Sequence, residues 1–294
     1  MTEAKVYLDY TQKELDDAFE QTVWAPNFEE LREKNKLRCA EVRARLEHFE
    51  RRYGEGQDET LEILPAKQRG APVLLFVHGG RWRPQPDNMF VYFADTIVDA
   101  GAHFVAARFA TLDPPKASTR MPDMIAELRR AVAWLAANAA SFGGDPNRIH
   151  IIGHSSGAHL TSVLLTTDWT QHGAPADVLK SGTCVSGMYE LRPVLLSARS
   201  AYVKLSAEEE DEFSAIRHLD RLRCPITVAY GSKESPEFQR QGRTFAAALR
   251  ERGWPSEELI LPGLNHFEGI RSMIEPHSKL ARSVLGPMGL SHSS

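Results

Sequence analysis

The sequence contains a serine whose surroundings could make it a nucleophile, Ser155 within Gly153-His154-Ser155-Ser156-Gly157. A short apolar run precedes this segment and small residues follow it, so a predicted strand turns directly into a predicted helix. Glycines on both sides of the serine permit a turn tight enough to hold its hydroxyl clear of the sheet. Because the bare Gly-x-Ser-x-Gly pattern also occurs in ordinary strand-to-helix turns, the interpretation depends on a base and an acid elsewhere in the chain.

The base that would activate this serine is predicted to be His266. A serine hydroxyl is a poor nucleophile until a base accepts its proton, and a carboxylate normally orients that base. His266 follows a predicted strand in a loop that contains glycine and asparagine. His154 and His159 flank the serine on its own segment, and His277 lies in the predicted closing helix. These three are weaker candidates, and the two flanking histidines are expected to pack or to support the site.

The acid is predicted from its position relative to the apolar strand 225–231. Glu234 lies just beyond this strand, whereas Glu237 follows Pro236, which is typical of a helix start and would turn the side chain away. Asp220 precedes the strand and would lie at the opposite edge of the sheet. We therefore predict Glu234 as the acid, with Glu237 as the alternative. The resulting order of nucleophile, acid and histidine is that of α/β-hydrolases.

A second glycine-containing loop could stabilise the negative charge that forms during nucleophilic attack. The apolar run 73–77 ends in His78-Gly79-Gly80-Arg81-Trp82. Glycines directly after a central strand let backbone N–H groups approach a ligand closely. We predict an oxyanion hole made by the N–H groups of Gly79, Gly80 and Ser156, the last at a helix start. Alone, the loop is equally compatible with a tight turn around a hydrogen-bonded histidine, and the downstream serine favours the functional interpretation.

The elements that must position these residues alternate between strand and helix, which predicts one doubly wound, mostly parallel sheet. Ligands bind beyond the carboxyl ends of the strands in such sheets. His78, Ser155, Glu234 and His266 all follow predicted strands, so we expect them to meet at one edge.

The more polar region 190–222 is predicted to be an insertion that shapes the pocket, with a solvated helix start at its acidic run. The expected strands are 59–64, 73–77, 103–108, 149–152, 183–186, 225–231 and 258–262, and the expected helices are 89–100, 122–141, 156–167 and 237–252. The Pro-rich segment 111–119 is expected to be a loop beside the site.

The first part of the chain, residues 1–57, is predicted to be a helical extension in front of a catalytic domain of residues 58–290. Apolar residues recur at helical spacing up to Tyr53, and Gly54 is a plausible end of that helix. We favour packing of this helix on the domain, with a lid over the site or a dimer contact as alternatives. Two capping boxes are expected, at Thr11 with Glu14 and at Asn27 with Glu30. The segment around Tyr10, Phe19 and Trp24 is a candidate to overhang the pocket.

The composition excludes several other classes of protein. The chain has 294 residues, of which 42% are hydrophobic and 25% charged, as in an ordinary globular protein. Its net charge of −4 gives no global attraction to nucleic acid or to an anionic membrane. No apolar run approaches the ~18 residues of a membrane span, and no signal peptide is expected. Cys39, Cys184 and Cys224 are too widely spaced for a zinc site or a disulfide framework. We expect a cytoplasmic enzyme that uses no metal or organic cofactor.

Four segments resemble signatures of the kynurenine formamidase (arylformamidase) family. The loop 78–82 resembles the family's HGG-x-W signature, and the segment 153–160 is similar to its GHSAGAHL segment. The segment 231–238 is similar to the acid loop, usually G-x-x-DSPEF, and Asn265-His266-Phe267 matches the histidine loop. The lead-in Asp145-Pro146-Asn147-Arg148-Ile149 is shared with the wider group of hormone-sensitive-lipase-like esterases. The resemblance covers roughly residues 60–285.

This resemblance implies an α/β-hydrolase fold and a serine hydrolase that cleaves a small amide or ester through an acyl-enzyme. The most specific version is an arylformamidase acting on N-formylkynurenine or a related N-acyl aromatic amine. The resemblance implies Ser155 as the nucleophile, Glu234 as the acid and His266 as the base, with Trp82 as a wall of the pocket. The sequence departs from the family at Glu234, where aspartate is normal.

A second departure from the family is Arg81, which stands where an aromatic residue is usual. We hypothesise that Arg81 or the nearby Arg83 meets a carboxylate of the substrate, and the alternative is an arginine that faces solvent.

Other functions considered are a general carboxylesterase or a degradative hydrolase for another aromatic ester or amide. A non-catalytic binding protein on the same fold is less favoured, because all three triad positions carry competent residue types. A dinucleotide-binding oxidoreductase is disfavoured, because no Gly-x-Gly-x-x-Gly follows the early strands. The expected partner is a small-molecule substrate, and the N-terminal helix suggests a homodimer.

Overall fold

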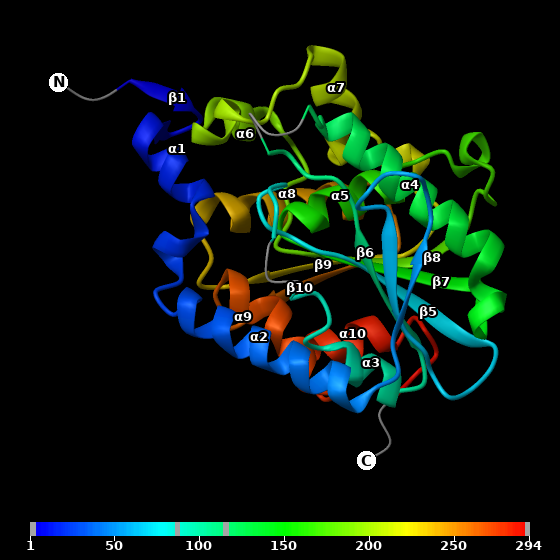
Figure 1. Ribbon diagram of the computed structural model, residues 1–294. Coiled ribbons are helices and arrows are strands. Elements are labelled where there is room, and N and C mark those ends of the chain that lie inside the picture. Colours follow the sequence, from blue (N-terminus) through cyan, green and yellow to red (C-terminus); the bar gives the residue numbers. More distant parts are fainter. Residues whose placement is uncertain (1–3, 86–88, 114–117, 292–294) are drawn as a thin grey trace.

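The computed structural model describes residues 4–85, 89–113 and 118–291. In these ranges a central eight-stranded sheet carries helices on both of its faces (Figure 1). The strand order is β10-β9-β8-β7-β5-β6-β4-β3, and all neighbours pair in parallel except at the β3 and β4 edge. The predicted doubly wound, mostly parallel sheet is therefore confirmed. Its strands are β3 (Phe49–Arg52), β4 (Thr60–Leu64), β5 (Ala71–Val77), β6 (His103–Arg108), β7 (Gly144–His154), β8 (Leu179–Val185), β9 (Ile226–Gly231) and β10 (Ser256–Leu261).

The helices lie in two layers, and the alternation of side chains in the central strand β5 explains why. Val73, Leu75 and Val77 are buried in one apolar cluster with side chains of α4, α5 and α8, whereas Leu74 and Phe76 are buried in another with side chains of α2, α3 and α10. The first three helices lie on one side of the sheet and the other three on the opposite side (Figure 1). A strand covered on both faces must be apolar at every position. The α-helices are α1 (Gln12–Phe19), α2 (Phe28–Arg45), α3 (Ala94–Asp99), α4 (Met121–Asn138), α5 (Ser156–Leu165), α6 (Arg192–Leu196), α7 (Ala207–Glu212), α8 (Pro236–Glu251), α9 (His266–Arg271) and α10 (Lys279–Leu285).

The N-terminal segment differs from its prediction in one important respect. The helix expected to continue to Gly54 ends at Arg45, and Phe49–Arg52 forms the edge strand β3, antiparallel to β4. The sequence of β3, Phe-Glu-Arg-Arg, suits an edge strand, because charged side chains discourage further pairing there. The sheet therefore begins inside the segment expected to be a helical extension. The division of the chain at residue 57 stays a prediction.

Of the two capping boxes, the first is confirmed and the second is wrong. Thr11 accepts a hydrogen bond from the Glu14 N–H, and the Glu14 carboxylate accepts one from the Thr11 N–H. Asn27 makes no side-chain cap for α2. Its carboxamide instead donates to Glu268 over 2.9 Å and accepts a hydrogen bond from the Asn265 side chain over 2.8 Å. Tertiary contacts with the start of α9 thus replace the local cap.

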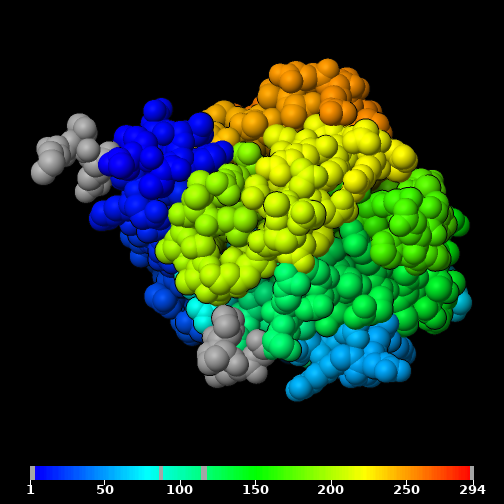
Figure 2. Space-filling view, turned by 90° about the horizontal axis from the view of Figure 1, so that it is seen from above, coloured from blue at the N-terminus to red at the C-terminus, as the bar shows by residue number. Residues whose placement is uncertain are grey.

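Contacts far along the chain hold the N-terminal segment against the rest of the molecule. On α2, Arg43 donates two hydrogen bonds to the buried carboxylate of Glu62 on β4, over 2.7 and 2.9 Å. On α1, Asp16 accepts a hydrogen bond from the backbone N–H of Ala198, and Gln12 donates to the carbonyl of Leu196. In the space-filling view the N-terminal segment (dark blue) lies directly against the yellow-green segment that follows β8 (Figure 2).

Several other expectations can be compared with the structure. The helix predicted for 89–100 is shorter, Ala94–Asp99, and the residues 90–93 that precede it are buried outside any helix. The acidic run 208–211 lies in α7, which Ser206 caps, as predicted. The expected loop 111–119 falls partly on residues 114–117, outside the described ranges.

All three cysteines are buried free thiols. No helix in the described ranges combines the length and apolar character needed to span a bilayer.

Candidate active site

The predicted site residues meet at the carboxyl edge of the sheet. Ser155 directly follows β7 and lies at the start of α5, with φ of 57° and ψ of −123°. A residue with a side chain adopts such a backbone conformation only when its surroundings enforce it, and strain of this kind is typical of functional turns. His266 follows β10 at the start of α9, and Glu234 follows β9.

Two glycines make the turn around Ser155 sterically feasible. A Cβ atom on Gly153 would overlap the backbone of Gly157 and the hydroxyl of Thr161. A Cβ atom on Gly157 would overlap the carbonyl groups at the end of β5. The Gly-x-Ser-x-Gly pattern therefore reflects close approach of α5 to β7 and to the end of β5.

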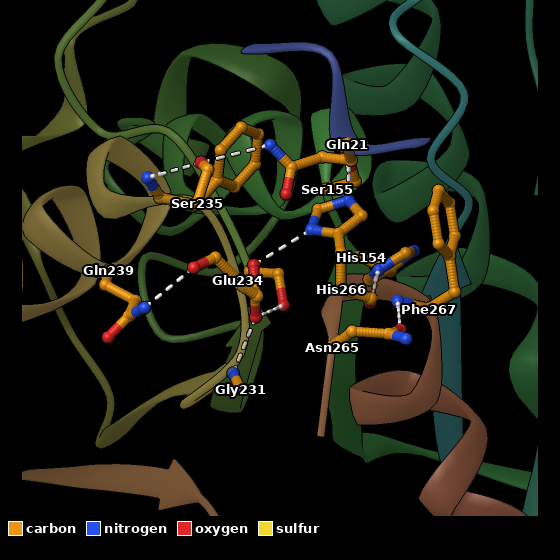
Figure 3. Close-up of polar contacts among 12 residues, drawn as sticks. Gln21, His154, Ser155, Gly231, Glu234, Ser235, Gln239, Asn265, His266 and Phe267 are labelled. Atoms are coloured by element: carbon orange, nitrogen blue, oxygen red, sulfur yellow. Dashed lines mark hydrogen bonds and ion pairs between the residues drawn. The ribbon is translucent and has the colours of Figure 1, made fainter. Parts of the chain in front are cut away.

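The structure brings Ser155, His266 and Glu234 into one chain of hydrogen bonds (Figure 3). The Ser155 Oγ and His266 Nε2 lie 2.9 Å apart, and His266 Nδ1 lies 2.9 Å from Glu234 Oε2. Their exposed fractions are 5%, 2% and 2% for serine, histidine and glutamate. With Nδ1–H donating to the carboxylate, Nε2 is left to accept the hydroxyl proton, which is the arrangement that general-base activation of a serine requires.

Both oxygens of Glu234 are held in place. While Oε2 faces His266, Oε1 accepts hydrogen bonds from the Ser186 hydroxyl over 2.7 Å and from the Gly231 N–H over 2.6 Å. Ser186 was not among the predicted site residues, although it directly follows strand β8 and therefore lies at the same edge of the sheet. The alternative acid, Glu237, is buried in α8 and forms a two-point ion pair with Arg240 over 2.7 and 2.8 Å. The carboxylate that faces His266 Nδ1 is that of Glu234.

The other histidines near the site are held as neutral rings by burial. Burial lowers the pKa of His78 and of His159 to about 4, and that of His154 well below its usual value. His154 Nε2 lies 2.9 Å from the carbonyl oxygen of His266, and His78 stacks on Phe90 with ring centroids 4.0 Å apart. His159 Nε2 lies 3.0 Å from the carbonyl oxygen of Phe213. His154 and His159 thus contact the backbone around the site, in agreement with their predicted role of packing or supporting it. His277 is exposed in a turn, not in the closing helix.

The glycine loop after β5 lies against the serine. A Cβ atom added to Gly79 would be 2.7 Å from the carbonyl oxygen of His154 and 3.0 Å from Ser155 Cβ. Within the described part of the chain, no group accepts a hydrogen bond from the N–H of Gly79, Gly80 or Ser156. These donors are therefore available to a negatively charged oxygen beside Ser155.

The two other residues singled out in this loop are placed differently. Trp82 is buried and does not line the cavity at Ser155, contrary to its predicted role as a wall. Its backbone N–H donates to Ser156 Oγ, and its indole N–H donates to His159 Nδ1 over 3.2 Å. Trp82 therefore stabilises the turn at the nucleophile and the first turns of α5. Arg81 does line the cavity, and its guanidinium pairs with Glu20 over 2.7 Å.

A cavity of about 180 Å³ opens at Ser155 and His266. One of its walls comes from the N-terminal segment, because Glu20 to Thr22 and side chains of α2 line it. Phe28 of α2 packs on Phe267 with ring centroids 4.5 Å apart, which closes this wall against α9. The segment around Tyr10, Phe19 and Trp24 was expected here, and its residues Glu20 to Thr22 do line the cavity. The three aromatic side chains themselves are not among the lining residues, since Phe19 is buried against Phe238 and Trp24 is exposed. Gln21 and Arg199 also line the cavity, although no sequence pattern singled them out.

A buried serine, histidine and carboxylate at the carboxyl edge of a doubly wound sheet define an α/β-hydrolase of the serine hydrolase type. The comparisons with known proteins agree and give the family. The kynurenine formamidase of Danio rerio is 30% identical over 246 residues, which cover 81% of this chain and 81% of the relative. The chain therefore belongs to the kynurenine formamidase family, and it is a hydrolase that acts on an amide or an ester.

Three further matches are consistent with this assignment. The kynurenine formamidase of Salmo salar is 28% identical over 81% of both chains. The BD-FAE family model matches residues 61–183. Among solved structures, a protein from Silicibacter sp. TM1040, provisionally described as a thioesterase, matches with a TM-score of 0.79 and 22% identity over 92% of this chain and 98% of its own. This last similarity supports the fold alone.

Proposed function

We propose that this protein is an arylformamidase that hydrolyses N-formylkynurenine or a related N-acyl aromatic amine. The observation that carries the proposal is the buried hydrogen-bonded chain from Ser155 through His266 to Glu234, which opens onto a cavity with aromatic walls. Phe28, Phe90 and Phe267 line this cavity, and such walls suit an aromatic amine. The two fish relatives are kynurenine formamidases, which supports the same substrate class.

In this proposal the reaction has two halves. Ser155 Oγ attacks the formyl carbon while His266 takes the hydroxyl proton, and the carbonyl oxygen becomes an oxyanion facing the N–H groups of Gly79, Gly80 and Ser156. His266 then protonates the nitrogen, the carbon–nitrogen bond breaks, and the aromatic amine leaves a formyl ester on Ser155. Water, deprotonated by His266, attacks this ester, and formate leaves as the serine recovers its proton.

The test is the hydrolysis of N-formylkynurenine against p-nitrophenyl acetate, followed by kynurenine absorbance and by p-nitrophenolate release. We expect the wild-type protein to prefer the formamide in kcat/KM. If only the activated ester reacts, and Ser155 is still required, the protein is a general carboxylesterase and the arylformamidase proposal fails. If Ser155→Ala hydrolyses the formamide as fast as wild type, the assigned nucleophile is wrong.

The role of the glycine loop can be tested at Gly79. In Gly79→Ala the new methyl group would meet the His154 carbonyl and Ser155 Cβ, so the loop must move away from the serine. Loss of one oxyanion donor typically lowers kcat by about 10²- to 10³-fold, and we expect a loss of that size with a smaller change in KM. Gly269→Ala is the matched control, because its methyl group would lie in ordinary contact, 3.5 Å from Leu261 Cδ1. Equal kcat in the two variants would contradict the assignment of Gly79.

Two expectations from the sequence stay predictions. One is a homodimer that uses the N-terminal segment, and light scattering of the purified protein would measure the mass in solution. The other is a cytoplasmic location. Small-molecule hydrolysis does not require either one.

A further inference from the structure

Arg199 is a buried arginine that lines the same cavity as Ser155 and has no acidic partner. It lies in the short 3₁₀ helix η4 (Ala198–Ala201) with an exposed fraction of 5%. Its guanidinium donates to the backbone carbonyl of Phe19 and, over 3.5 Å, to the sulfur of Met188. Among the described residues, no Asp or Glu forms an ion pair with it. Two acceptors, one of them a weak thioether, leave most of its five N–H donors without a partner.

Such an arrangement is costly unless the cavity is occupied by an anion. A buried guanidinium loses its hydration, and only a paired charge or several hydrogen bonds normally offset that loss. Burial also lowers the pKa of Arg199 to about 10, which still leaves it charged at neutral pH. The rings of Phe19 and Trp82 lie 5.3 and 5.7 Å from the guanidinium carbon, and they hold it in position without neutralising its charge.

The neighbouring charges do not supply the missing anion. Glu20 also lines the cavity, but its carboxylate accepts hydrogen bonds from the Arg81 guanidinium over 2.7 Å and from the Thr22 hydroxyl over 2.7 Å. Arg81, Glu20 and Arg199 together therefore carry one net positive charge. Arg83 is exposed, with its guanidinium over the ring of Tyr202. Arg81 thus has an acidic partner and Arg83 is exposed to water, so Arg199 is the one of these three arginines whose charge is both buried and without an acidic partner.

A second unsatisfied group lies two residues from the carbonyl that Arg199 binds. Gln21 donates from Nε2 to the Ala18 carbonyl and to the Ser235 hydroxyl, which fixes the orientation of its carboxamide (Figure 3). Its Oε1 is buried without a hydrogen-bond donor among the described residues, and Gln21 lines the cavity. An unpartnered buried carbonyl oxygen requires an N–H or O–H donor.

We propose that Arg199 binds a carboxylate of the substrate and that the Gln21 oxygen accepts a hydrogen bond from an N–H group beside that carboxylate. The inference rests on the proposed function, since it concerns what else the substrate must carry besides the bond that Ser155 cleaves. These two contacts would favour amides or esters that carry an amino-acid head group over amides or esters that lack a carboxylate. It also moves the carboxylate contact, first hypothesised for Arg81 or Arg83, to a residue of the inserted region 190–222.

The test measures binding and therefore does not depend on turnover. In the Ser155→Ala background, calorimetry compares N-formylkynurenine with its counterpart in which hydrogen replaces the carboxylate. We expect the carboxylate to improve affinity by about 10- to 100-fold, as for hydrogen bonds to a charged group. Adding Arg199→Met should remove most of this difference, and Arg199→Lys should keep part of it. Gln21→Leu should weaken both probes alike, because both keep the N–H group.

The controls separate this inference from the proposed function. Arg250→Met, on the far end of α8 in an exposed ion pair with Glu258, makes the same substitution outside the cavity and should keep the full carboxylate preference. Equal affinity for the two probes in the Ser155→Ala protein would overturn the inference, as would loss of the preference in Arg81→Met with its full retention in Arg199→Met. Should Arg199→Met fail to fold, the comparison of probes and the lysine variant decide the question. Failure of hydrolysis in the wild-type protein would instead refute the proposed function.

Discussion

Ser155→Ala is expected to lower kcat/KM for the amide substrate by about 10⁵- to 10⁶-fold, a size typical of removing the nucleophile of a serine triad. The reason is structural, because the hydroxyl lies 2.9 Å from His266 Nε2 in a site where serine and histidine are both buried. No other described serine hydroxyl is bonded to that nitrogen. Substrate binding should survive, since alanine leaves the walls of the cavity unchanged.

Steady-state kinetics and intact-protein mass spectrometry would check this result. Wild type treated with an organophosphonate should gain one adduct, and Ser155→Ala should gain none. The double variant Ser155→Ala/His266→Ala should be no slower than either single one, because the members of a triad act as a unit. Ser162→Ala is the matched control in the same helix, as its hydroxyl donates only to the His159 carbonyl. An active, labelled Ser155→Ala protein would refute the assignment.

Glu234→Gln is expected to lower kcat by about 10³- to 10⁴-fold with a small change in KM, as in other triads that lose the acid. The carboxylate accepts three hydrogen bonds, one from His266 Nδ1–H and two at the other oxygen from Ser186 and Gly231. A carboxamide must turn its NH₂ group toward one of these sets of donors. The imidazolium then loses its counter-charge, or its ring loses the correct tautomer.

Two matched variants make this prediction specific to Glu234. Glu237→Gln alters the buried glutamate three residues further along, in the first turn of α8, which pairs with Arg240, and it should affect thermal stability far more than kcat. Glu234→Asp restores the residue normal in the family but is shorter by one methylene group. It should be slower than wild type, because the Ser186 and Gly231 contacts hold the longer side chain in place. Loss of kcat in Glu237→Gln, with none in Glu234→Gln, would make Glu237 the acid.

The backbone requirements of the site could be read from the sequence because they are local. Gly153 and Gly157 mark a turn too tight for side chains, and an apolar strand before Ser155 shows where that turn must lie. Strands that alternate with helices place their carboxyl ends at one edge, so His266 and Glu234 were expected beside the serine. The hydrogen bonds among these three residues agree with that placement.

The sequence pattern was misleading where a local period competed with long-range pairing. Apolar residues at helical spacing predicted a helix up to Gly54, yet Phe49–Arg52 pairs with β4 instead, where it extends the sheet. Asn27 has the sequence of a cap, but its carboxamide is used by Asn265 and Glu268, more than two hundred residues away. In both cases a contact that local spacing cannot encode determined the structure.

The sequence by itself thus determined the fold class and the order of serine, acid and histidine, because turn geometry and strand periodicity depend on neighbouring residues. Only the tertiary structure decided what surrounds them. In that structure α2 and Gln21 form a wall of the cavity, and Arg199 is buried without an acidic partner. Trp82 lies outside the lining of the cavity, where it contacts the turn that carries the serine. Burial and charge compensation arise between segments distant in the chain, and these properties govern which substrate the site can bind.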